Sequence, residues 1–419
     1  MATAKAKKYT YKKSMDLFRK AAQFIPGGIY GHQSPTILVP GRYPYYTSKT
    51  EGAYFWDPDG NKFLDLMCAY GPIILGYQHP KVEEATAAYR RVAGTASTQP
   101  PAIMVELAER MVNLVAHADW VVFAKNGSDA TTYAMRVARE QTHRPKILMA
   151  GGAYHGAHAW CTPGHGGLVP EDRTHIHNYR FNDIEGIRRL IEEQYKDQVA
   201  AIIMTPYHHP AFADSEMPTP DFYPAVRGIC DKNGVMLIVD DVRAGFRLSL
   251  KGSHHFFGVR PDLVAFSKAI ANGYPLSAVT GGEHLKMAAG RVFFTGSFWS
   301  NADSFAASLA TLAELEAIDG VALMNRLGAK LKAGYYDAAK AHGLQISITG
   351  PNTIPYMKFA NETDFRRMQT FAAECTERGV FTHPHHNWFI SAAMTDADID
   401  FAIDVADQAF AVVKKTFGG

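Results

Sequence analysis

The chain has 419 residues, of which 47% are hydrophobic and 20% are charged. A chain of this length can bury a large core, and at about 150 residues per domain it is expected to form two domains. The formal net charge is only +2, and no run of five like charges occurs. This charge pattern argues against a nucleic-acid partner and against a polybasic membrane surface.

No apolar stretch approaches the roughly 20 residues of a membrane-spanning helix, and no apolar segment follows the lysines near the N-terminus. We therefore expect no membrane association and a cytoplasmic location. The cysteines lack Cys-x-x-Cys spacing, so free and mostly buried thiols are expected instead of disulfides or a zinc site. These cysteines are Cys68, Cys161, Cys230 and Cys375.

The N-terminal region predicts an amphipathic helix over about residues 11–24, which Pro26-Gly27-Gly28 stops, and a hairpin-like segment at 52–61. The middle of the chain alternates apolar strands with helical stretches. That alternation is typical of βαβ units in a largely parallel sheet covered on both faces. Ser128 is expected to cap a helix that runs to about Thr142. The expected strands lie at residues 120–123, 146–149, 200–204, 235–239 and 263–266.

The C-terminal region predicts short β segments at residues 345–348 and 354–359, followed by two helices that open at Thr363 and Thr395. The expected fold class is therefore α/β, with a mostly parallel sheet in a large domain and a smaller α+β domain built from both termini. The expected domains are an N-terminal segment of the small domain (1–60), a large domain (61–318) and a C-terminal small domain (319–419).

Two expected strands end in side chains of opposite charge. Asp240 follows the run at 235–239, and Lys268 follows the run at 263–266. Because the carboxyl ends of parallel strands meet at one edge of a sheet, both groups are expected at one crevice. Pyridoxal phosphate (PLP) chemistry needs both groups: a lysine forms a Schiff base with the aldehyde, and an aspartate keeps the pyridine nitrogen protonated. A structural salt bridge is the alternative for either residue alone.

Three more segments suit the phosphate and the ring of such a cofactor. Asn126-Gly127-Ser128-Asp129 presents the amides of a helix N-terminus, which bind phosphate. Tyr154-His155-Gly156 places an aromatic ring directly after a strand, and residues 295–301 offer hydroxyls and a glycine. Each segment has an ordinary alternative, namely a strand-to-helix turn, packing or a polar loop. Their combination favours a PLP site.

Two rival sites find less support. The 18 histidines include adjacent pairs and a cluster near residue 385, but none has His-Glu-x-x-His spacing or a carboxylate triad nearby, so no metal site is expected. The motif Gly-x-Gly-x-x-Gly is absent, which leaves a nicotinamide-binding fold without its phosphate loop.

In these residues the chain resembles the class III (ω) aminotransferases of PLP fold type I, the aspartate aminotransferase-like fold, and most closely their glutamate-1-semialdehyde aminomutase-like branch. The resemblance spans nearly the whole chain, and its motifs occur in family order. They are Pro26-Gly27-Gly28, residues 52–60, residues 70–76 with His79-Pro80, residues 126–130, residues 154–156, Asp240-Asp241-Val242 with Gly245-Phe246-Arg247, Ser267-Lys268 and Asn301.

This resemblance implies that Lys268 forms the Schiff base with PLP and that Asp240 pairs with the pyridinium. It also implies that Ser297, at the family's usual threonine, reaches the phosphate of the partner subunit, so that a homodimer shares its two sites. Val242 and Tyr154 would sandwich the ring, while Gly127 and Ser128 would bind the phosphate. The complete implied cofactor-binding set is Gly127, Ser128, Tyr154, His155, Asp240, Val242, Lys268 and Ser297.

Several departures from the family pattern concern the substrate. The aminomutase branch carries an arginine shortly after Pro-Gly-Gly, whereas residues 29–35 contain none. Thr205-Pro206 replaces the usual glutamate-proline, Asp241 replaces a glutamate, and Arg243 stands where an amide or thioether is common. Candidates for lining a different acceptor pocket, with packing or exposure as the alternative for each, are Tyr30, His32, Tyr207, His208 and Arg243.

The expected function is PLP-dependent transfer of an amino group from an amino acid or amine donor to a keto acid, ketone or aldehyde acceptor, by a ping-pong mechanism. Lys268 would also act as the general base that moves the proton. The alternatives are an aminomutase of the glutamate-1-semialdehyde type and an amino-acid racemase or epimerase.

Overall fold

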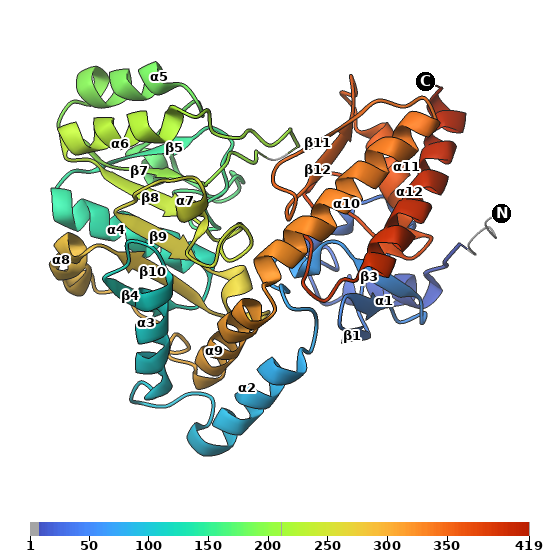
Figure 1. Cartoon of the computed structure of the whole chain (residues 1–419), viewed down its shortest axis with the longest axis horizontal. Helices are drawn as coiled ribbons and strands as arrows, with labels where there is room; N and C mark the ends of the chain where they lie inside the picture. The colour runs from blue at the N-terminus through green and yellow to red at the C-terminus, as the bar shows by residue number, and fades with distance from the viewer. Residues whose placement is uncertain (1–7, 211, 419) are drawn as a thin grey trace. The chain divides into compact units, whose positions relative to one another are not determined.

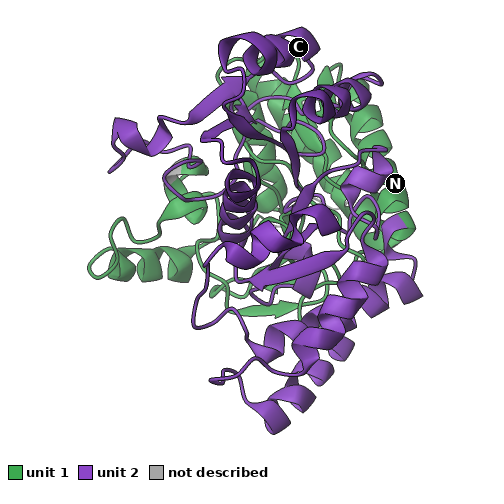
Figure 2. Ribbon diagram, turned by 90° about the vertical axis from the view of Figure 1, so that its left-hand side faces the viewer, with its two compact units in different colours: residues 1–79, 322–419 green, residues 80–321 purple. Residues whose placement is uncertain are grey.

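Figure 1 shows a computed structural model of the chain, which describes residues 8–210 and 212–418. The chain forms two compact units. Unit 1 combines residues 1–79 with 322–419, and unit 2 comprises residues 80–321 (Figure 2). The predicted domain boundaries at residues 60 and 318 remain a prediction.

A seven-stranded sheet forms the centre of unit 2, with strand order β4-β10-β9-β8-β7-β5-β6. Strand β10 is antiparallel to both of its neighbours, while the pairs among β5 to β9 are parallel. The sheet is therefore mostly parallel, and the predicted α/β class is confirmed. The strands are β4 (Trp120–Ala124), β5 (Lys146–Ala150), β6 (Ile176–Tyr179), β7 (Val199–Met204), β8 (Met236–Asp240), β9 (Leu263–Phe266) and β10 (Ser277–Gly281).

Both faces of this sheet are covered. Successive side chains along β7 point to opposite faces, and all of them are buried. Ile203 and Ile238 pack in one apolar cluster that includes residues of helix α4 (Gly127–Thr142). Ile202 and Leu237 point to the opposite face and have no exposed surface. The other helices of unit 2 are α2 (Pro80–Ala93), α3 (Ile103–Leu114), α5 (Ile184–Arg189), α6 (Phe222–Asn233), α7 (Ser253–Phe256), α8 (Lys286–Arg291) and α9 (Ala302–Ala317).

Unit 1 is the α+β unit, and the two ends of the chain build one sheet in it. Strand β13 (Val380–Phe381) pairs in parallel with β3 (Lys62–Asp65) in a four-stranded sheet of order β1-β2-β3-β13. The sequence pattern predicted the hairpin β2–β3, and it is confirmed. The other elements are α1 (Lys12–Ala21), β1 (Lys49–Glu51), β2 (Tyr54–Trp56), the hairpin β11 (Ile346–Thr349) with β12 (Tyr356–Phe359), α11 (Arg366–Thr376) and α12 (Asp396–Phe417). Helix α10 (Gly320–Ala341) begins at the end of unit 2 and continues into unit 1.

Two predicted helix starts are wrong. Helix α4 is capped by Asn126 instead of Ser128, because the Asn126 side chain accepts from the Asp129 amide at 3.1 Å. Helix α11 begins after Phe365 instead of at Thr363, since Phe365 has a left-handed backbone with φ 58°. The predicted cap at Thr395 is confirmed, with a capping box that includes Asp398.

All four cysteines are free and buried, as expected. Among the described residues, no helix is both long enough and apolar enough to cross a membrane.

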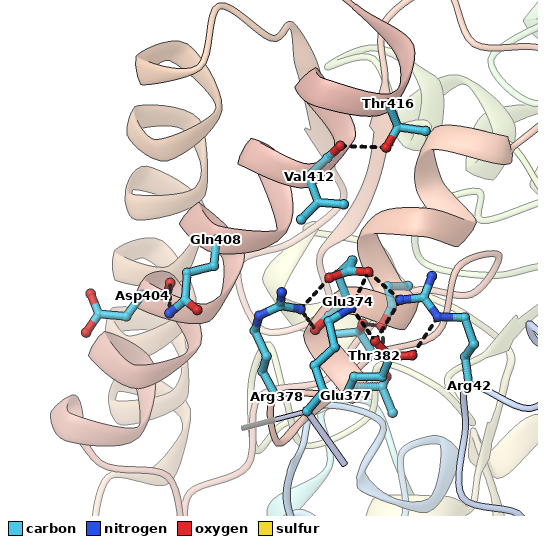
Figure 3. Close-up of polar contacts among 12 residues, drawn as sticks. Arg42, Glu374, Glu377, Arg378, Thr382, Asp404, Gln408, Val412 and Thr416 are labelled. Atoms are coloured by element: carbon cyan, nitrogen blue, oxygen red, sulfur yellow. Dashed lines mark hydrogen bonds and ion pairs between the residues drawn. The ribbon is translucent and has the colours of Figure 1, made fainter. Parts of the chain in front are cut away.

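A partly buried ion-pair network, centred on the buried Glu374, ties the N-terminal segment of unit 1 to helix α11 (Figure 3). The Glu374 carboxylate accepts from Lys8 at 2.8 Å, from Arg378 at 2.6 Å and from Arg42. Arg42 also binds Glu377 in bidentate fashion at 2.6 and 2.8 Å. Burial alone would raise the pKa of Glu374, but the hydrogen bonds from Lys8, Arg378 and Arg42 outweigh it and lower the pKa to about 2.

Replacing Glu374 by Gln should lower the free energy of unfolding by about 1.5–3 kcal/mol at pH 7, because charged hydrogen bonds to a side chain that is only 4% exposed are lost. A carboxyl with a lowered pKa stabilises the fold above its usual pKa and loses that contribution as the pH falls. The difference between wild type and Glu374→Gln should therefore stay constant from pH 7 to about pH 5 and shrink below that.

Urea unfolding at a series of pH values measures this difference. Glu316→Gln is the matched control, because Glu316 forms an ion pair with Arg110 but its side chain is 58% exposed. An equal loss of stability in both variants would refute the role of the buried network.

Candidate active site

The ends of β8 and β9 bring Asp240 and Lys268 to the same edge of the sheet. The two strands are parallel neighbours, with Asp240 in register with Ala265. Asp240 is the last residue of β8, and Lys268 lies two residues beyond the end of β9. A carboxylate and an amine therefore leave the sheet side by side, as the strand pattern predicts.

The Asp240 carboxylate is buried, with 4% of the residue exposed, and held by two hydrogen bonds. Its Oδ2 lies 2.7 Å from Nδ1 of His155, and its Oδ1 accepts from the Val242 amide at 3.1 Å. An ionised carboxylate can only accept, so Nδ1 carries the proton of the His155 ring. These two contacts fix the orientation of the carboxylate.

His155 is itself positioned by residues that the sequence analysis did not single out. Thr131 on α4 donates its hydroxyl to the His155 carbonyl oxygen at 2.6 Å. The Trp160 ring lies parallel to the imidazole, with centroids 6.4 Å apart. The sequence pattern indicates neither contact: Thr131 lies 24 residues before His155, and the parallel placement of the Trp160 and His155 rings depends on how the loop after β5 folds.

Lys268 has an unusual backbone and an electrostatically perturbed amine. Its φ of 49° is left-handed, which costs a residue other than glycine roughly 1 kcal/mol or more. The hydroxyl of Ser267 donates to the Leu276 carbonyl at 2.9 Å and anchors the preceding residue. Burial, followed by the positive charge of Arg243, lowers the pKa of Lys268 to about 7, against the opposing effect of Asp240. A substantial fraction of the amine is therefore neutral at physiological pH and nucleophilic.

The start of α4 forms a close-fitting cradle beside these groups. A methyl group on Gly127 would lie 2.8 Å from Cγ1 of Val242, and one on Gly156 would lie 2.6 Å from Oγ of Ser128. Gly156 also has φ 134°, which strongly favours glycine. Ser128 Oγ accepts from the Ala157 amide at 2.9 Å, so two chain segments are held together at the amides of the helix N-terminus. Such an end binds phosphate.

The remaining predicted site residues are more exposed. Tyr154 is 46% exposed, and burial of the rest of its ring raises the pKa of its hydroxyl. Ser297 is exposed on the segment between α8 and α9. Its neighbour Phe298 lies 5.2 Å from the Lys125 amine, which is directly before the cap of α4. The structure thus gathers seven of the eight predicted residues around the strand ends, and leaves Ser297 on an exposed loop.

The candidates for an acceptor pocket fall into two groups. Tyr207 and His208 are buried in the segment after β7, and Arg243 is partly buried after β8. Tyr30 and His32 belong to unit 1, where the His32 ring packs edge-on against Tyr70 at 4.4 Å. Among the described residues, no group of three or more His, Cys, Asp or Glu side chains could hold a metal ion.

Comparisons with known proteins agree with this arrangement. The family described as aminotransferase class-III matches residues 39–410. An aminopentol aminotransferase of Sphingopyxis macrogoltabida is 42% identical, over 96% of this chain and 94% of the relative. A 3-aminobutyryl-CoA aminotransferase of Cloacimonas acidaminovorans is 34% identical, over 98% and 99%. The solved structure of the FumI protein of Sphingopyxis sp. MTA144, in its PLP internal aldimine form, is 41% identical with a TM-score of 0.95, over 97% of this chain and 98% of that one.

Proposed function

The chain belongs to the class-III aminotransferase family and is a PLP-dependent aminotransferase, and from this we propose how its own residues carry out the reaction. The observation that carries the proposal is the placement of Lys268 and Asp240 at the ends of adjacent parallel strands. An amine with a lowered pKa and a buried, hydrogen-bonded carboxylate are the two groups that PLP chemistry requires.

The described residues fit this cofactor. Lys268 provides the amine for the covalent Schiff-base link, and Asp240, oriented by His155, provides the partner for the ring nitrogen. The amides and hydroxyl of Gly127 and Ser128 bind the phosphate, a role that the steric cradle supports. Val242 and Tyr154 would lie against the ring of the cofactor. When bound, PLP would accept the electron pair that remains on the substrate carbon after its proton is removed.

Lys268 has a second role as general base. When it is not covalently linked to the cofactor, its nitrogen would accept the proton from the substrate carbon and deliver it to C4′ of the cofactor. A base is most effective when its pKa lies near the working pH, and a pKa of about 7 meets this condition. Asp240, held by His155 and the Val242 amide, would pair with the ring nitrogen and so support the negative charge that develops on the substrate carbon.

The reaction proceeds by a ping-pong sequence, in which the donor leaves its nitrogen before the acceptor enters. Donors include amines as well as amino acids, which the similarity to a relative named aminopentol aminotransferase supports. An internal transfer of the aminomutase type requires that one substrate be held through both half-reactions. The absence of an arginine from residues 29–35 favours release between them.

The functional unit is a homodimer in which Ser297 reaches the phosphate site of the partner. Large apolar side chains on either side of Ser297 support an interface here, since Phe293 is 82% exposed and Phe298 is 61% exposed.

The enzyme resides in the cytoplasm, which its four free, buried cysteines support.

Replacing Lys268 by Ala should abolish the covalent link to PLP, because no amine remains at the end of β9. Borohydride reduction followed by peptide mass mapping detects the link as a modified lysine. Lys286→Ala is the matched control, because the Lys286 side chain is 54% exposed on α8. This variant should remain fully labelled at Lys268. A reducible adduct at the wild-type level in Lys268→Ala would identify another lysine as the anchor.

Asp240→Asn should retain the covalent link. The activation free energy of proton transfer should rise by several kcal/mol, because a neutral amide does not hold the ring nitrogen charged. Single-turnover absorbance with an amino donor measures this rate. Near-normal turnover by the folded variant would refute the role of Asp240.

An isotope-labelled donor distinguishes the candidate reactions. With ¹⁵N-labelled donors and a separate keto acid, the label should appear in the newly formed amino acid, because the nitrogen passes through the enzyme. Conversion of glutamate-1-semialdehyde without any donor or acceptor would instead show an aminomutase. Exchange of the α-hydrogen with inversion, and without transfer of nitrogen, would show a racemase or epimerase.

Ser297→Ala should weaken PLP binding by roughly three- to tenfold, equivalent to one hydrogen bond of about 1 kcal/mol. Fluorescence titration of the cofactor-free protein with PLP measures the affinity, and sedimentation measures the oligomeric state. Ser300→Ala on the same loop is the control. A fully active wild-type monomer in sedimentation would exclude the shared site.

A further inference from the structure

Two loops leave the sheet beside Lys268, one after β7 and one after β8. The strands are parallel neighbours, with Met204 in register with Val239. The segment after Met204 carries Tyr207 and His209, and the segment after Asp240 carries Arg243. Side chains from both loops therefore share one wall of the site.

Arg243 lies within electrostatic range of the other side chains of this wall. The charge of Arg243 acts on Lys268, on His209 and on Tyr207. Burial lowers the pKa of Arg243, while Tyr207, Asp240 and Tyr154 act in the opposite direction. The Arg243 guanidinium therefore lies in the same region as Tyr154, Asp240 and Lys268.

Positive charge exceeds negative charge in this region. Arg247 is a second cation and is fully buried. Asp240 is already engaged by His155 and by the Val242 amide. Burial raises the pKa of Asp241 to about 7, so that its carboxyl is partly neutral. A low-dielectric region with excess positive charge favours an anionic ligand.

The loop after β7 adds neutral hydrogen-bonding groups to the same wall. The Tyr207 hydroxyl and Nδ1 of His209 are buried, and neither has a hydrogen-bond partner among the described residues. Tyr207 is fully buried and His209 is 8% exposed, with ring centroids 5.3 Å apart. Burial, with the charge of Arg243 adding to it, keeps the pKa of His209 well below its usual range, so its ring is neutral.

The backbone that carries Tyr207 is held rigidly. The Thr205 hydroxyl donates to the Tyr207 carbonyl at 2.7 Å. The Tyr223 hydroxyl on α6 contacts the carbonyls of Thr205 and Pro206 at 3.1 and 2.6 Å. The unpartnered groups are therefore held in place before any ligand arrives, which reduces the entropy cost of binding.

We propose that Arg243, together with Tyr207 and His209, binds the carboxylate of an amino-acid donor and of the keto-acid acceptor that follows it. This inference rests on the proposed function and assigns its substrates to the carboxylate-bearing class. A guanidinium binds a carboxylate through two parallel hydrogen bonds, and a hydroxyl can donate to the remaining lone pairs. Arg243 thereby supplies the cation that residues 29–35 lack.

Calorimetric titration of the holoenzyme with propanoate, an unreactive carboxylate, tests the inference without turnover. Arg243→Met should weaken propanoate binding by roughly 10- to 100-fold, the effect of losing a charged hydrogen bond. Arg243→Lys should recover part of the affinity, and Tyr207→Phe should lose roughly three- to tenfold. Arg291→Met is the control, because Arg291 is exposed at the end of α8.

Half-reaction kinetics distinguish the carboxylate from the amine. In Arg243→Met, KM for alanine and for pyruvate should rise at least tenfold more than KM for propan-2-amine, which has no carboxylate. Unchanged propanoate affinity in Arg243→Met would overturn the inference, as would equal increases in KM for alanine and propan-2-amine. A shift in the pH dependence of the visible absorption, with propanoate affinity unchanged, would overturn it in favour of an effect of Arg243 on the cofactor.

These outcomes are separable from a failure of the proposed function. Propanoate binding requires neither Lys268 as a base nor transfer of nitrogen. An enzyme that binds propanoate through Arg243 but transfers no label would refute the proposed reaction and leave the carboxylate site intact.

Discussion

The hydrogen bond between His155 and Asp240 is the interaction on which the site depends. It joins the segment after β5 to the end of β8 across the intervening strand β7, and both side chains are buried. The contacts from His155 and the Val242 amide fix the direction of the carboxylate and give its buried oxygens hydrogen-bond partners. Thr131 and Trp160 then hold His155, which extends the support to α4 and to the loop after β5.

Opposite charges are balanced unevenly around Lys268, and this imbalance gives the site its chemistry. Burial and Arg243 both disfavour the ammonium form of Lys268, whereas Asp240 favours it. The net effect is an amine that can lose its proton near neutral pH. Burial is the main cause of the lowered pKa of Lys268, and the positive charge of Arg243 adds to it. The same charge of Arg243 favours an anionic substrate group, so reactivity and substrate class share this electrostatic contribution.

The two units contribute different kinds of stability. In unit 2 the central strands are buried on both faces, and the polar site residues occur only where the strands end. Unit 1 instead relies in part on a partly buried ionic network, in which the buried Glu374 binds Arg378 of its own helix and Lys8 and Arg42 from the N-terminal segment. Loss of one partner in such a network leaves a charge without compensation, so the network is stabilising only when complete.

The parallel pairing and the positions of Asp240 and Lys268 at strand ends could be predicted from the sequence, because apolar runs of strand length that end in charged residues are a local pattern. The strand order and the strands β6 and β10 were not predicted. Gly127 also indicated a close approach of the backbone. The start of α4 required the structure, because the contact with the Asp129 amide shows that Asn126 caps the helix instead of the predicted Ser128. The pairing of His155 with Asp240, the excess of positive charge near Lys268 and the buried Tyr207 hydroxyl required the tertiary structure. They depend on side chains that lie up to 85 residues apart along the chain and meet only after the sheet has formed.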